Sequence, residues 1–163
     1  MKGYWNRPDE TEKVMDKDGF FRTGDVGYVD EDGYIFIVDR IKDMINASGM
    51  KVFPRKVEEA IMSHPAVSEA LVIGVAHDYR GETVKAFVVL KEGQKLDHKE
   101  LTEYLKDRLA PYEMPKMMEQ RDALPKTMIG KPDKKALVAE EKAKAEATKA
   151  QKSGNKPPQA PRM

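Results

Sequence analysis

The stretch that most constrains the fold is residues 36–59, where two apolar segments flank a dense group of charges. An apolar run ends at Val38, a turn follows at 48–49, and Pro54 suits the first turn of a helix. Four charged side chains fall within five residues between the apolar segments: Asp39, Arg40, Lys42 and Asp43. Burying unpaired charges is costly, so we expect them to lie where two parts of the molecule meet water and a ligand. A solvated loop with incidental ion pairs is the alternative.

Composition narrows the class of protein. A chain of 163 residues has room for one ordinary domain plus appendages, and its formal net charge of +1 gives no global basic field for nucleic acid or an anionic membrane. The absence of cysteine excludes disulfides and thiolate metal sites. No apolar run approaches the roughly 20 residues that span a bilayer, and the first residues lack a signal-peptide pattern. We therefore expect a cytoplasmic protein.

Residues 1–19 are polar and rich in turn-forming residues, and two strands are predicted after them. We expect one or two helical turns over 8–14 and two strands, about 26–29 and 34–38. Asp30-Glu31-Asp32-Gly33 joins these strands, and a glycine-terminated hairpin turn is favoured over a metal-binding loop. Thr23-Gly24-Asp25 is expected to end a strand. Tyr4 and Trp5 are large for a free terminus, which indicates packing against something upstream.

Residues 43–137 predict a compact α+β domain. A helix begins at Pro54, and the apolar runs 67–75 and 83–90 are expected to be neighbouring core strands. Asp97 with Glu100 is a capping-box pattern that opens a helix to about Leu109, stopped by Pro111. A third strand is expected over 116–121, and a further helix from Pro132.

The last segment, 138–163, has no apolar stripe, and we expect it to be a Lys/Ala/Pro tail, helical at first and then disordered. Glu140–Lys144 and Lys142–Glu146 are pairs four residues apart that support an exposed helix weakly. From Ser153 the chain is expected to be disordered. Residues 139–163 contain six basic and three acidic side chains, a local charge of +3. A solvated tail is favoured over a contact with nucleic acid or lipid.

Three short stretches carry side chains suited to nucleotide chemistry. Gly24 permits close backbone approach, and the Asp25 carboxylate can accept hydrogen bonds from ribose hydroxyls. Arg40 can offer a forked cation to a phosphate or a ribose. Lys131, after Gly130, presents an ammonium on a flexible stem, which suits negative charge that develops during group transfer.

In order and spacing, these stretches resemble the C-terminal part of adenylate-forming enzymes, from about residue 3 to 137. That superfamily includes acyl-CoA and aryl-CoA synthetases, adenylation domains of peptide synthetases, and beetle luciferases. The segments most similar to bacterial long-chain and medium-chain fatty-acid CoA ligases are Phe36-Ile37-Val38-Asp39-Arg40, Ile45-Asn46-Ala47-Ser48-Gly49, Pro111-Tyr112-Glu113-Met114-Pro115-Lys116 and Leu124-Pro125-Lys126.

The resemblance implies that ATP and a carboxylate form an acyl-adenylate, and that the acyl group then passes to the thiol of CoA. It implies that Lys131 is the catalytic lysine of adenylation and that Lys42 is the hinge. Asp25, Arg40 and Lys51 would contact the nucleotide, whereas Ser48-Gly49 would line the pantetheine tunnel in a second pose. Mg²⁺ would be bound mainly through the phosphates and the large domain, with no metal ligands in this chain.

The same resemblance implies a division of the chain. Residues 1–41 would be the last segment of a large domain whose phosphate loop, adenine pocket and acyl tunnel lie upstream, and 43–137 would be its lid. The lid alone would be inactive, and its partners would be ATP, a fatty acid, CoA and the large domain. Peripheral membrane contact has no support in the sequence. The alternatives are the lid of an aryl-CoA ligase, the lid of an adenylation domain that loads a carrier protein, and a non-catalytic binding module.

Overall fold

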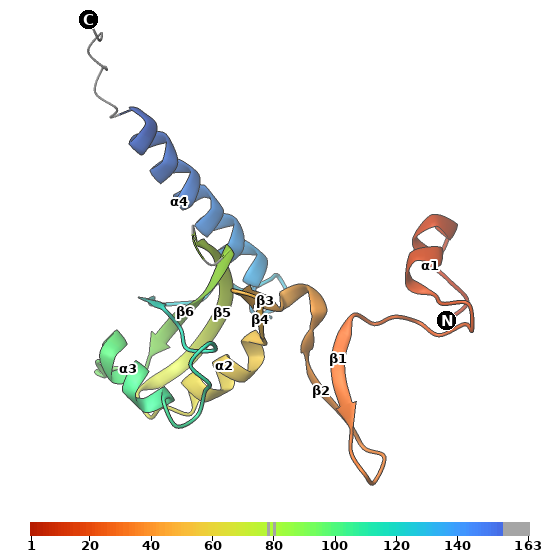
Figure 1. The fold of residues 1–163 in the computed structure, drawn as a ribbon, viewed down its shortest axis with the longest axis horizontal. Helices are drawn as coiled ribbons and strands as arrows, with labels where there is room; N and C mark the ends of the chain where they lie inside the picture. Colours follow the sequence, from red (N-terminus) through yellow and green to blue (C-terminus); the bar gives the residue numbers. More distant parts are fainter. Residues whose placement is uncertain (78, 80, 155–163) are drawn as a thin grey trace, which may run out of the picture. The chain divides into compact units, whose positions relative to one another are not determined.

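The computed structural model describes residues 1–77, 79 and 81–154, and it divides the chain into two compact units (Figure 1). Unit 1 comprises Met1–Met44 and unit 2 comprises Ile45–Met163. The division falls two residues after Lys42, the position predicted as the hinge. Each unit is described by itself below.

Unit 1 consists of a short helix and a β-hairpin. Helix α1 (Pro8–Val14) begins with a proline at its first turn, where the missing N–H costs nothing. Strands β1 (Asp25–Val29) and β2 (Ile35–Arg40) are antiparallel, and a 3₁₀ turn η1 (Ile41–Asp43) follows β2. The segment Thr23-Gly24-Asp25 therefore leads into a strand, and the prediction that it ends one is wrong.

The acidic quartet between β1 and β2 is a hairpin turn, as the sequence predicts. The N–H of Asp30 donates to the carbonyl of Tyr34 at 3.0 Å, and the N–H of Gly33 donates to the carbonyl of Asp30 at 3.1 Å. Gly33 has a φ of 87°, which glycine adopts without strain. In the described part of the chain, no three His, Cys, Asp or Glu side chains gather in a way that could hold a metal ion.

Unit 2 is built on a five-stranded sheet. Its strands are β3 (Ile45–Ala47), β4 (Met50–Val52), β5 (Val67–His77), β6 (Gly81–Leu90) and β7 (Met117–Gln120). The order is β4-β3-β6-β5, and β7 pairs in parallel with β6. The sequence predicts only three strands for this unit, and this prediction is wrong. The two strands that it misses, β3 and β4, have three residues each. Strands this short show no recognisable alternation of apolar and polar side chains.

Both faces of this sheet are covered, which gives three layers. Successive side chains of a strand point to opposite faces, so β5 contributes to two cores. Ala70 and Val72 pack in the core that contains side chains of α2 (Pro54–Met62) and α3 (His98–Leu105). Leu71, Ile73 and Val75 pack with Leu137 of α4 (Lys134–Gly154) on the opposite face. The α+β fold class predicted from the sequence is confirmed.

Capping side chains determine where α3 and α4 begin. The Asp97 carboxylate accepts the N–H of Glu100 at 2.7 Å, which confirms the predicted cap of α3. This helix ends at Leu105 and not at Leu109, although Leu109 remains buried. Helix α4 begins two residues after Pro132, because the Asp133 carboxylate accepts the N–H groups of two residues in the first turn, Lys135 and Ala136.

Helix α4 extends to Gly154, beyond the start of the predicted disorder at Ser153, and the rest of that predicted segment lies outside the described residues. Within the described residues, no helix combines the length and the apolar character that crossing a membrane requires.

Candidate functional site

Asp25 and Arg40, both predicted to contact a nucleotide, lie opposite each other across the β1–β2 hairpin. They are partners in the strand register, and Arg40 Nε is 3.1 Å from Asp25 Oδ1. The Thr23 hydroxyl accepts the N–H of Asp25 at 3.0 Å, and Gly24 has a φ of 77°. A quarter of the Asp25 side chain remains exposed, so its carboxylate retains capacity for further donors.

The four charges between the two apolar segments do not share one environment. Asp39 is 8% exposed, and its Oδ1 accepts the N–H of Arg40 at 2.8 Å. Arg40 and Lys42 are exposed, and Lys42 lies in the 3₁₀ turn that ends unit 1. One charge of the group is therefore buried and hydrogen-bonded, whereas the predicted hinge residue faces solvent.

Ser48 and Gly49 form the tight turn between β3 and β4. Ala47 pairs with Met50, so only these two residues make the connection. Their φ angles are 57° and 85°, the two positive values of a two-residue hairpin turn that favours Asn, Asp or Gly followed by glycine, and here Ser48 takes the first position. Nothing lies within 4 Å of a Cβ built at Gly49, and Lys51 is exposed on β4 two residues later.

Lys131 lies in a closed loop between β7 and α4. The N–H of Thr127 donates to the carbonyl of Lys131 at 2.7 Å, and the N–H of Gly130 donates to the carbonyl of Thr127 at 2.8 Å. Met128 and Ile129 at its tip are exposed. The structure shows no ion pair for the Lys131 side chain with any of the described residues. The backbone is thus fixed while the ammonium stays available.

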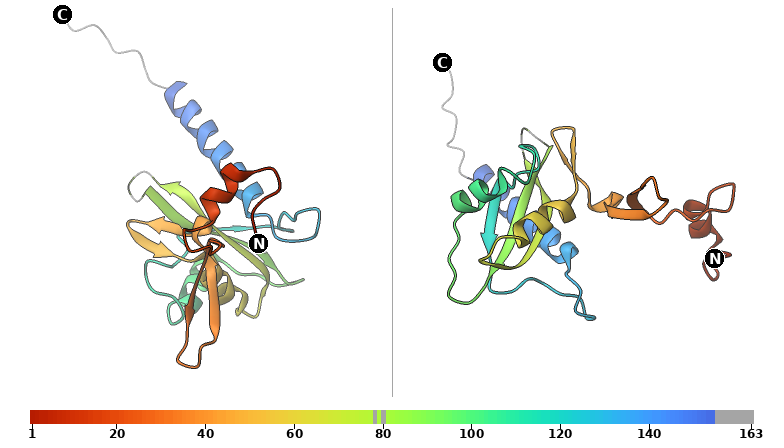
Figure 2. Two further views of the ribbon diagram at one scale, coloured as in Figure 1. Left: turned by 90° about the vertical axis from the view of Figure 1, so that its right-hand side faces the viewer. Right: turned by 90° about the horizontal axis from the view of Figure 1, so that it is seen from below.

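The Ser48–Gly49 turn and the Lys131 loop lie at opposite ends of unit 2. Both views of Figure 2 show the β3–β4 hairpin projecting at one side of the sheet and the loop before α4 projecting at the other. The structure therefore brings Asp25 and Arg40 together, but it does not bring Ser48 and Gly49 to Lys131. The two predicted sites of unit 2 cannot contact one small ligand simultaneously.

A six-residue ionic network attaches α4 to the sheet, and apart from one pair within the helix it was not predicted from the sequence. Lys85 Nζ lies 2.7 Å from carboxylates of both Glu119 and Glu141, and Arg121 lies 2.6 Å from carboxylates of Glu119 and Glu140. Lys144 completes the network with Glu140 at 2.9 Å, which confirms that predicted helical pair. The signal available in the sequence was a lysine within the apolar run 83–90.

This network changes the acid–base properties of its members. Hydrogen bonds from Arg121, and then from Lys144, lower the pKa of Glu140 to about 2. For Glu119, burial acts to raise the pKa, but hydrogen bonds from Lys85 and Arg121 together outweigh it and lower the pKa below its usual value. The network therefore favours the ionised forms of Glu119 and Glu140, which pair with cations on the sheet and on α4.

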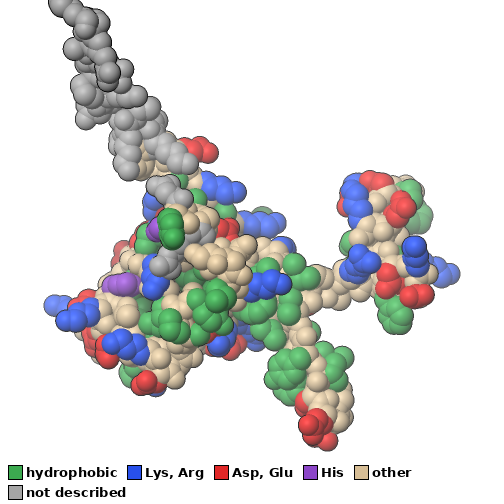
Figure 3. Space-filling view, in the orientation of Figure 1, with side chains coloured by type: hydrophobic (Ala, Val, Ile, Leu, Met, Phe, Trp, Pro, Cys, Tyr) green, Lys and Arg blue, Asp and Glu red, His purple; other side chains and the backbone are tan. Residues whose placement is uncertain are grey.

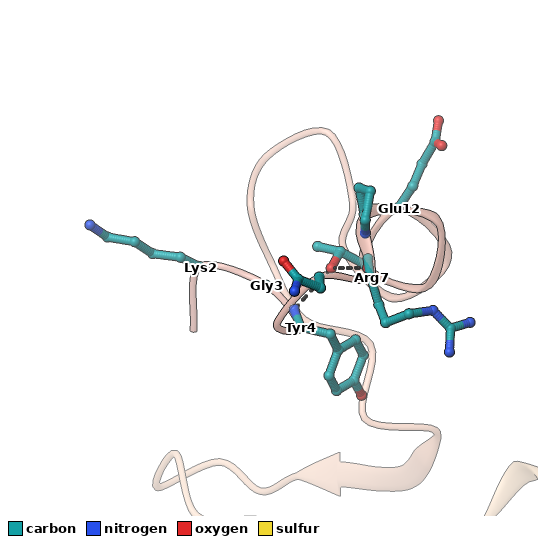
Figure 4. Close-up of a pocket in the computed structure, with 8 residues that line it drawn as sticks. Lys2, Gly3, Tyr4, Arg7 and Glu12 are labelled. Atoms are coloured by element: carbon teal, nitrogen blue, oxygen red, sulfur yellow. Dashed lines mark hydrogen bonds between the residues drawn. The ribbon is translucent and has the colours of Figure 1, made fainter.

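Two surface depressions lie away from every predicted site residue. The first, of about 420 Å³, is near the start of unit 1, where the Thr11 hydroxyl accepts the N–H of Tyr4 at 2.9 Å. Figure 4 shows the side chains of Lys2, Arg7 and Glu12 pointing in different directions around it. The second, of about 350 Å³, is lined by residues of α3 and of segment 109–116.

Comparison with known proteins places this geometry in a family. Residues 56–131, which run from α2 to the Lys131 loop, match the family model described as AMP-binding enzyme C-terminal domain. This chain carries an AMP-binding enzyme C-terminal domain. The resemblance to adenylate-forming enzymes noted from the sequence is confirmed.

Relatives with this domain include acid–thiol ligases. The chain is 54% identical over 141 residues to long-chain-fatty-acid–CoA ligase of Bacillus subtilis (strain 168), a match that covers 86% of the chain and 25% of the relative. It is 47% identical over 131 residues to feruloyl-CoA synthase of an Amycolatopsis species, covering 80% of the chain and 26% of that protein.

A solved structure with the same fold is ATP-bound MatB from Rhodopseudomonas palustris. Its TM-score is 0.80 at 40% identity, over 85% of this chain and 27% of that one. The chain thus spans about a quarter of the length of the curated relatives that it matches.

Proposed function

We propose that this chain is the C-terminal quarter of an AMP-forming acyl-CoA synthetase, which adenylates a fatty acid and then transfers the acyl group to CoA. The observation that supports this proposal most strongly is the 54% identity with a Bacillus subtilis protein named long-chain-fatty-acid–CoA ligase. ATP, the acid and CoA are the substrates in this proposal, and a large domain that precedes unit 2 supplies the remainder of the active site. The cytoplasmic location stays a prediction from the sequence.

In this proposal Asp25 and Arg40 hold the nucleotide. The Asp25 carboxylate accepts hydrogen bonds from the ribose hydroxyls, while Arg40 offers its exposed guanidinium to the ribose or the phosphates. Their ion pair at 3.1 Å places the two side chains side by side on the same face of the hairpin. Lys51 approaches the nucleotide only in the second half-reaction.

Lys131 and the Ser48–Gly49 turn then act in different half-reactions. The Lys131 ammonium offsets negative charge where the carboxylate attacks the α-phosphate, a role that matters in the transition state. Gly49 lacks a side chain and leaves width for pantetheine to reach the acyl-adenylate. In this proposal unit 2 rotates about Lys42 to present each group in turn, and the placement of the two groups at opposite ends of unit 2 supports it.

The surface of unit 1 supports a large-domain partner. Hydrophobic side chains cover the β1–β2 hairpin, as the green surface in Figure 3 shows, and Tyr28 stacks on Phe36 with ring centroids 5.0 Å apart. The exposed apolar side chains of the two strands are Tyr28, Val29, Ile35, Phe36 and Ile37. A two-stranded hairpin is marginally stable by itself, so we propose that the large domain covers it.

Magnesium belongs to this proposal through ATP. We propose that the phosphates and the large domain hold the ion, and that this chain's residues bind and orient the nucleotide. When bound, Mg²⁺ neutralises part of the phosphate charge.

A chimera tests the proposal. Residues 1–163 replace the matching C-terminal quarter of the Bacillus subtilis relative, and acyl-CoA formation is measured with ATP, Mg²⁺, CoA and a long-chain fatty acid. We expect turnover by the chimera and none by the chain alone. A folded chimera without turnover, or turnover by the chain alone, would contradict the proposal.

The identity with feruloyl-CoA synthase favours an aromatic acid as the second candidate substrate. The resemblance to this family implies that the large domain selects the acid. The choice of acid must therefore be measured with the native large domain. Thioester formation from fatty and cinnamic-type acids, measured with that domain joined to this chain, decides between the two.

A further inference from the structure

The Lys131 loop is a closed hairpin whose orientation depends on how its two ends are attached. Besides its internal hydrogen bonds, the N–H of Asp133 donates to the carbonyl of Pro125 at 2.8 Å, which ties the two ends together. Lys126 and Pro132 form an isolated antiparallel bridge beside it. The loop can therefore move only as one piece, and the attachments of the residues at its two ends set where Lys131 lies.

The C-terminal end of the loop is held at a buried carboxylate. Lys134, the first residue of α4, places its Nζ 2.8 Å from Glu58 Oε1 on α2. The same oxygen accepts the N–H of Val72 on β5 at 2.8 Å. The side chain of Glu58 is 12% exposed and that of Lys134 is 24% exposed. Three elements, α2, β5 and α4, thus meet at one carboxylate oxygen that is largely shielded from water.

The N-terminal end of the loop is held much more weakly. Lys126 Nζ lies 2.9 Å from Glu69 Oε1, at almost the same distance as in the Lys134–Glu58 pair. The side chains are 47% and 41% exposed, so water screens this pair and its contribution to stability is small. The two pairs flank the same loop and differ mainly in burial, which makes Lys126 a matched control for Lys134.

We propose that Glu58 and Lys134 are a positioning pair that sets the placement of Lys131 for adenylation. This inference rests on the proposed function, because it assigns no chemistry to the pair itself. Lys134 is three residues from Lys131, a stretch of at most about 11 Å of chain. A shift at the start of α4 is therefore passed to Lys131 with little attenuation. A displacement of about 1 Å at a reacting group can cost about a hundredfold in rate.

If the Glu58–Lys134 pair only stabilised the fold, its loss would give different results from those of a positioning pair. Such a loss would affect both half-reactions alike, because the Ser48–Gly49 turn belongs to the same unit. A positioning role confines the defect to the half-reaction that uses Lys131. It also loosens the hydrogen bonds of the loop without loosening the rest of the sheet.

The test combines one measurement on the chain with one on the chimera. In the chain, amide hydrogen exchange is measured at Thr127 and Gly130, the donors inside the loop. In the chimera, pyrophosphate exchange reports adenylation, and thioester formation from synthetic acyl-adenylate reports the second half-reaction. The variants are Lys134→Met, the conservative Lys134→Arg, and the control Lys126→Met.

For Lys134→Met we expect about fivefold or faster exchange of the loop amides and about a tenfold loss of pyrophosphate exchange, with thioester formation within about twofold of the parent. Lys134→Arg keeps the cation and should restore both readouts to within about twofold. Lys126→Met should change each readout by less than about twofold.

Unchanged loop exchange with unchanged adenylation in Lys134→Met would overturn the positioning role, as would equal losses in the two half-reactions. Lys131→Ala in the same chimera separates this failure from failure of the proposed function. If Lys131→Ala keeps full adenylation, the proposed role of Lys131 is wrong. If Lys131→Ala loses adenylation but Lys134→Met does not, only the positioning role is wrong.

Discussion

Glu113 shows how one buried carboxylate holds a loop of unit 2 together. It is 3% exposed, it accepts the N–H of Ala110 at 2.9 Å, and it lies 2.7 Å from Lys56 Nζ on α2. The two partners are unequal, because the side chain of Lys56 is 53% exposed and can be hydrated without Glu113. Loss of the Lys56 ammonium leaves the Glu113 carboxylate buried without a counter-charge. Loss of the charge on Glu113 leaves only the Lys56 ammonium, which water can hydrate.

We therefore predict that Lys56→Met lowers the free energy of unfolding more than Glu113→Gln does. The difference between the two variants should be about 1–2 kcal/mol, because Lys56→Met leaves an uncompensated buried charge. Glutamine still accepts the N–H of Ala110. Urea unfolding of both variants, with m-values checked for equality, measures the difference. An equal or reversed ranking would mean that Glu113 is better solvated than its burial indicates.

At the residue scale, local patterns predicted local structure well. The cap at Asp97 and the turn at Ser48–Gly49 follow from the side chains themselves, and both are present. The Glu58–Lys134 and Lys56–Glu113 pairs join residues more than 50 positions apart. No local signal identifies such partners, because the contact exists only after the sheet and helices have packed.

Helix α4 is an element whose attachment depends on charge as well as on apolar packing. Leu137 is fully buried and Val138 packs partly against the same core, but beyond Val138 the helix contacts the sheet through the ion pairs of Glu140, Glu141 and Lys144. The apolar stripe of the helix disappears from about Ala139, and for this reason residues 138–163 were predicted to be a tail. The packing on the sheet extends further, because Lys85 and Arg121 project from β6 and from the end of β7 toward the helix.

This attachment should weaken in acid. The pKa of Glu140 is lowered from 4.5 to about 2, so its contribution to stability is complete above about pH 4.5 and is lost as the pH falls toward 2. NMR titration of the Glu140 carboxyl carbon should give a midpoint near 2, and Arg121→Met should move it toward 4.5. A midpoint near 4.5 in the unmodified chain would show that Arg121 does not hold this carboxylate in solution.

Long helices and strands were predicted more accurately from the sequence than short ones. The long apolar strands β5 and β6 were expected within a few residues of their observed ends, and so was α2. Strands β3 and β4 were missed, because three residues are too few to show a period. Among the described residues, β3 pairs with β6 through Ala47 and Gly81, which lie more than 30 positions apart in the sequence. The sheet edge that carries the Ser48–Gly49 turn therefore became visible only in the structure.

At the scale of the whole molecule, the chain is two units joined near Lys42. Arg40 and Lys42 are exposed at the end of unit 1, whereas the ionic network holds α4 to the sheet as far as Lys144. We predict that brief trypsin digestion cuts first at Arg40 or Lys42 and leaves a resistant fragment that extends past Lys144. Mass spectrometry of the fragments checks both ends. Survival of residues 1–41 with rapid loss of the sheet would contradict this boundary.

The overall fold class could be predicted from the sequence because it depends on apolar periodicity and on the family resemblance. The proposal that the two ends of unit 2 act in different half-reactions follows from the family resemblance, and the structure adds that these ends lie on opposite sides of the sheet. Lys131 and the Ser48–Gly49 turn are about 80 residues apart in sequence, and nothing in either local pattern states whether they meet. Their placement on opposite sides of the sheet supports the proposal that they act in different half-reactions.

The most direct test of this account is to run the two half-reactions separately in the chimera. Lys131→Ala should abolish pyrophosphate exchange, yet still convert supplied acyl-adenylate and CoA to thioester. Gly49→Leu should do the reverse, because its side chain fills the space required by pantetheine, and Gly49→Ala, which carries the same strain at a positive φ without the bulk, is its control. Equal damage to both half-reactions by both variants would contradict a unit that works with one end at a time.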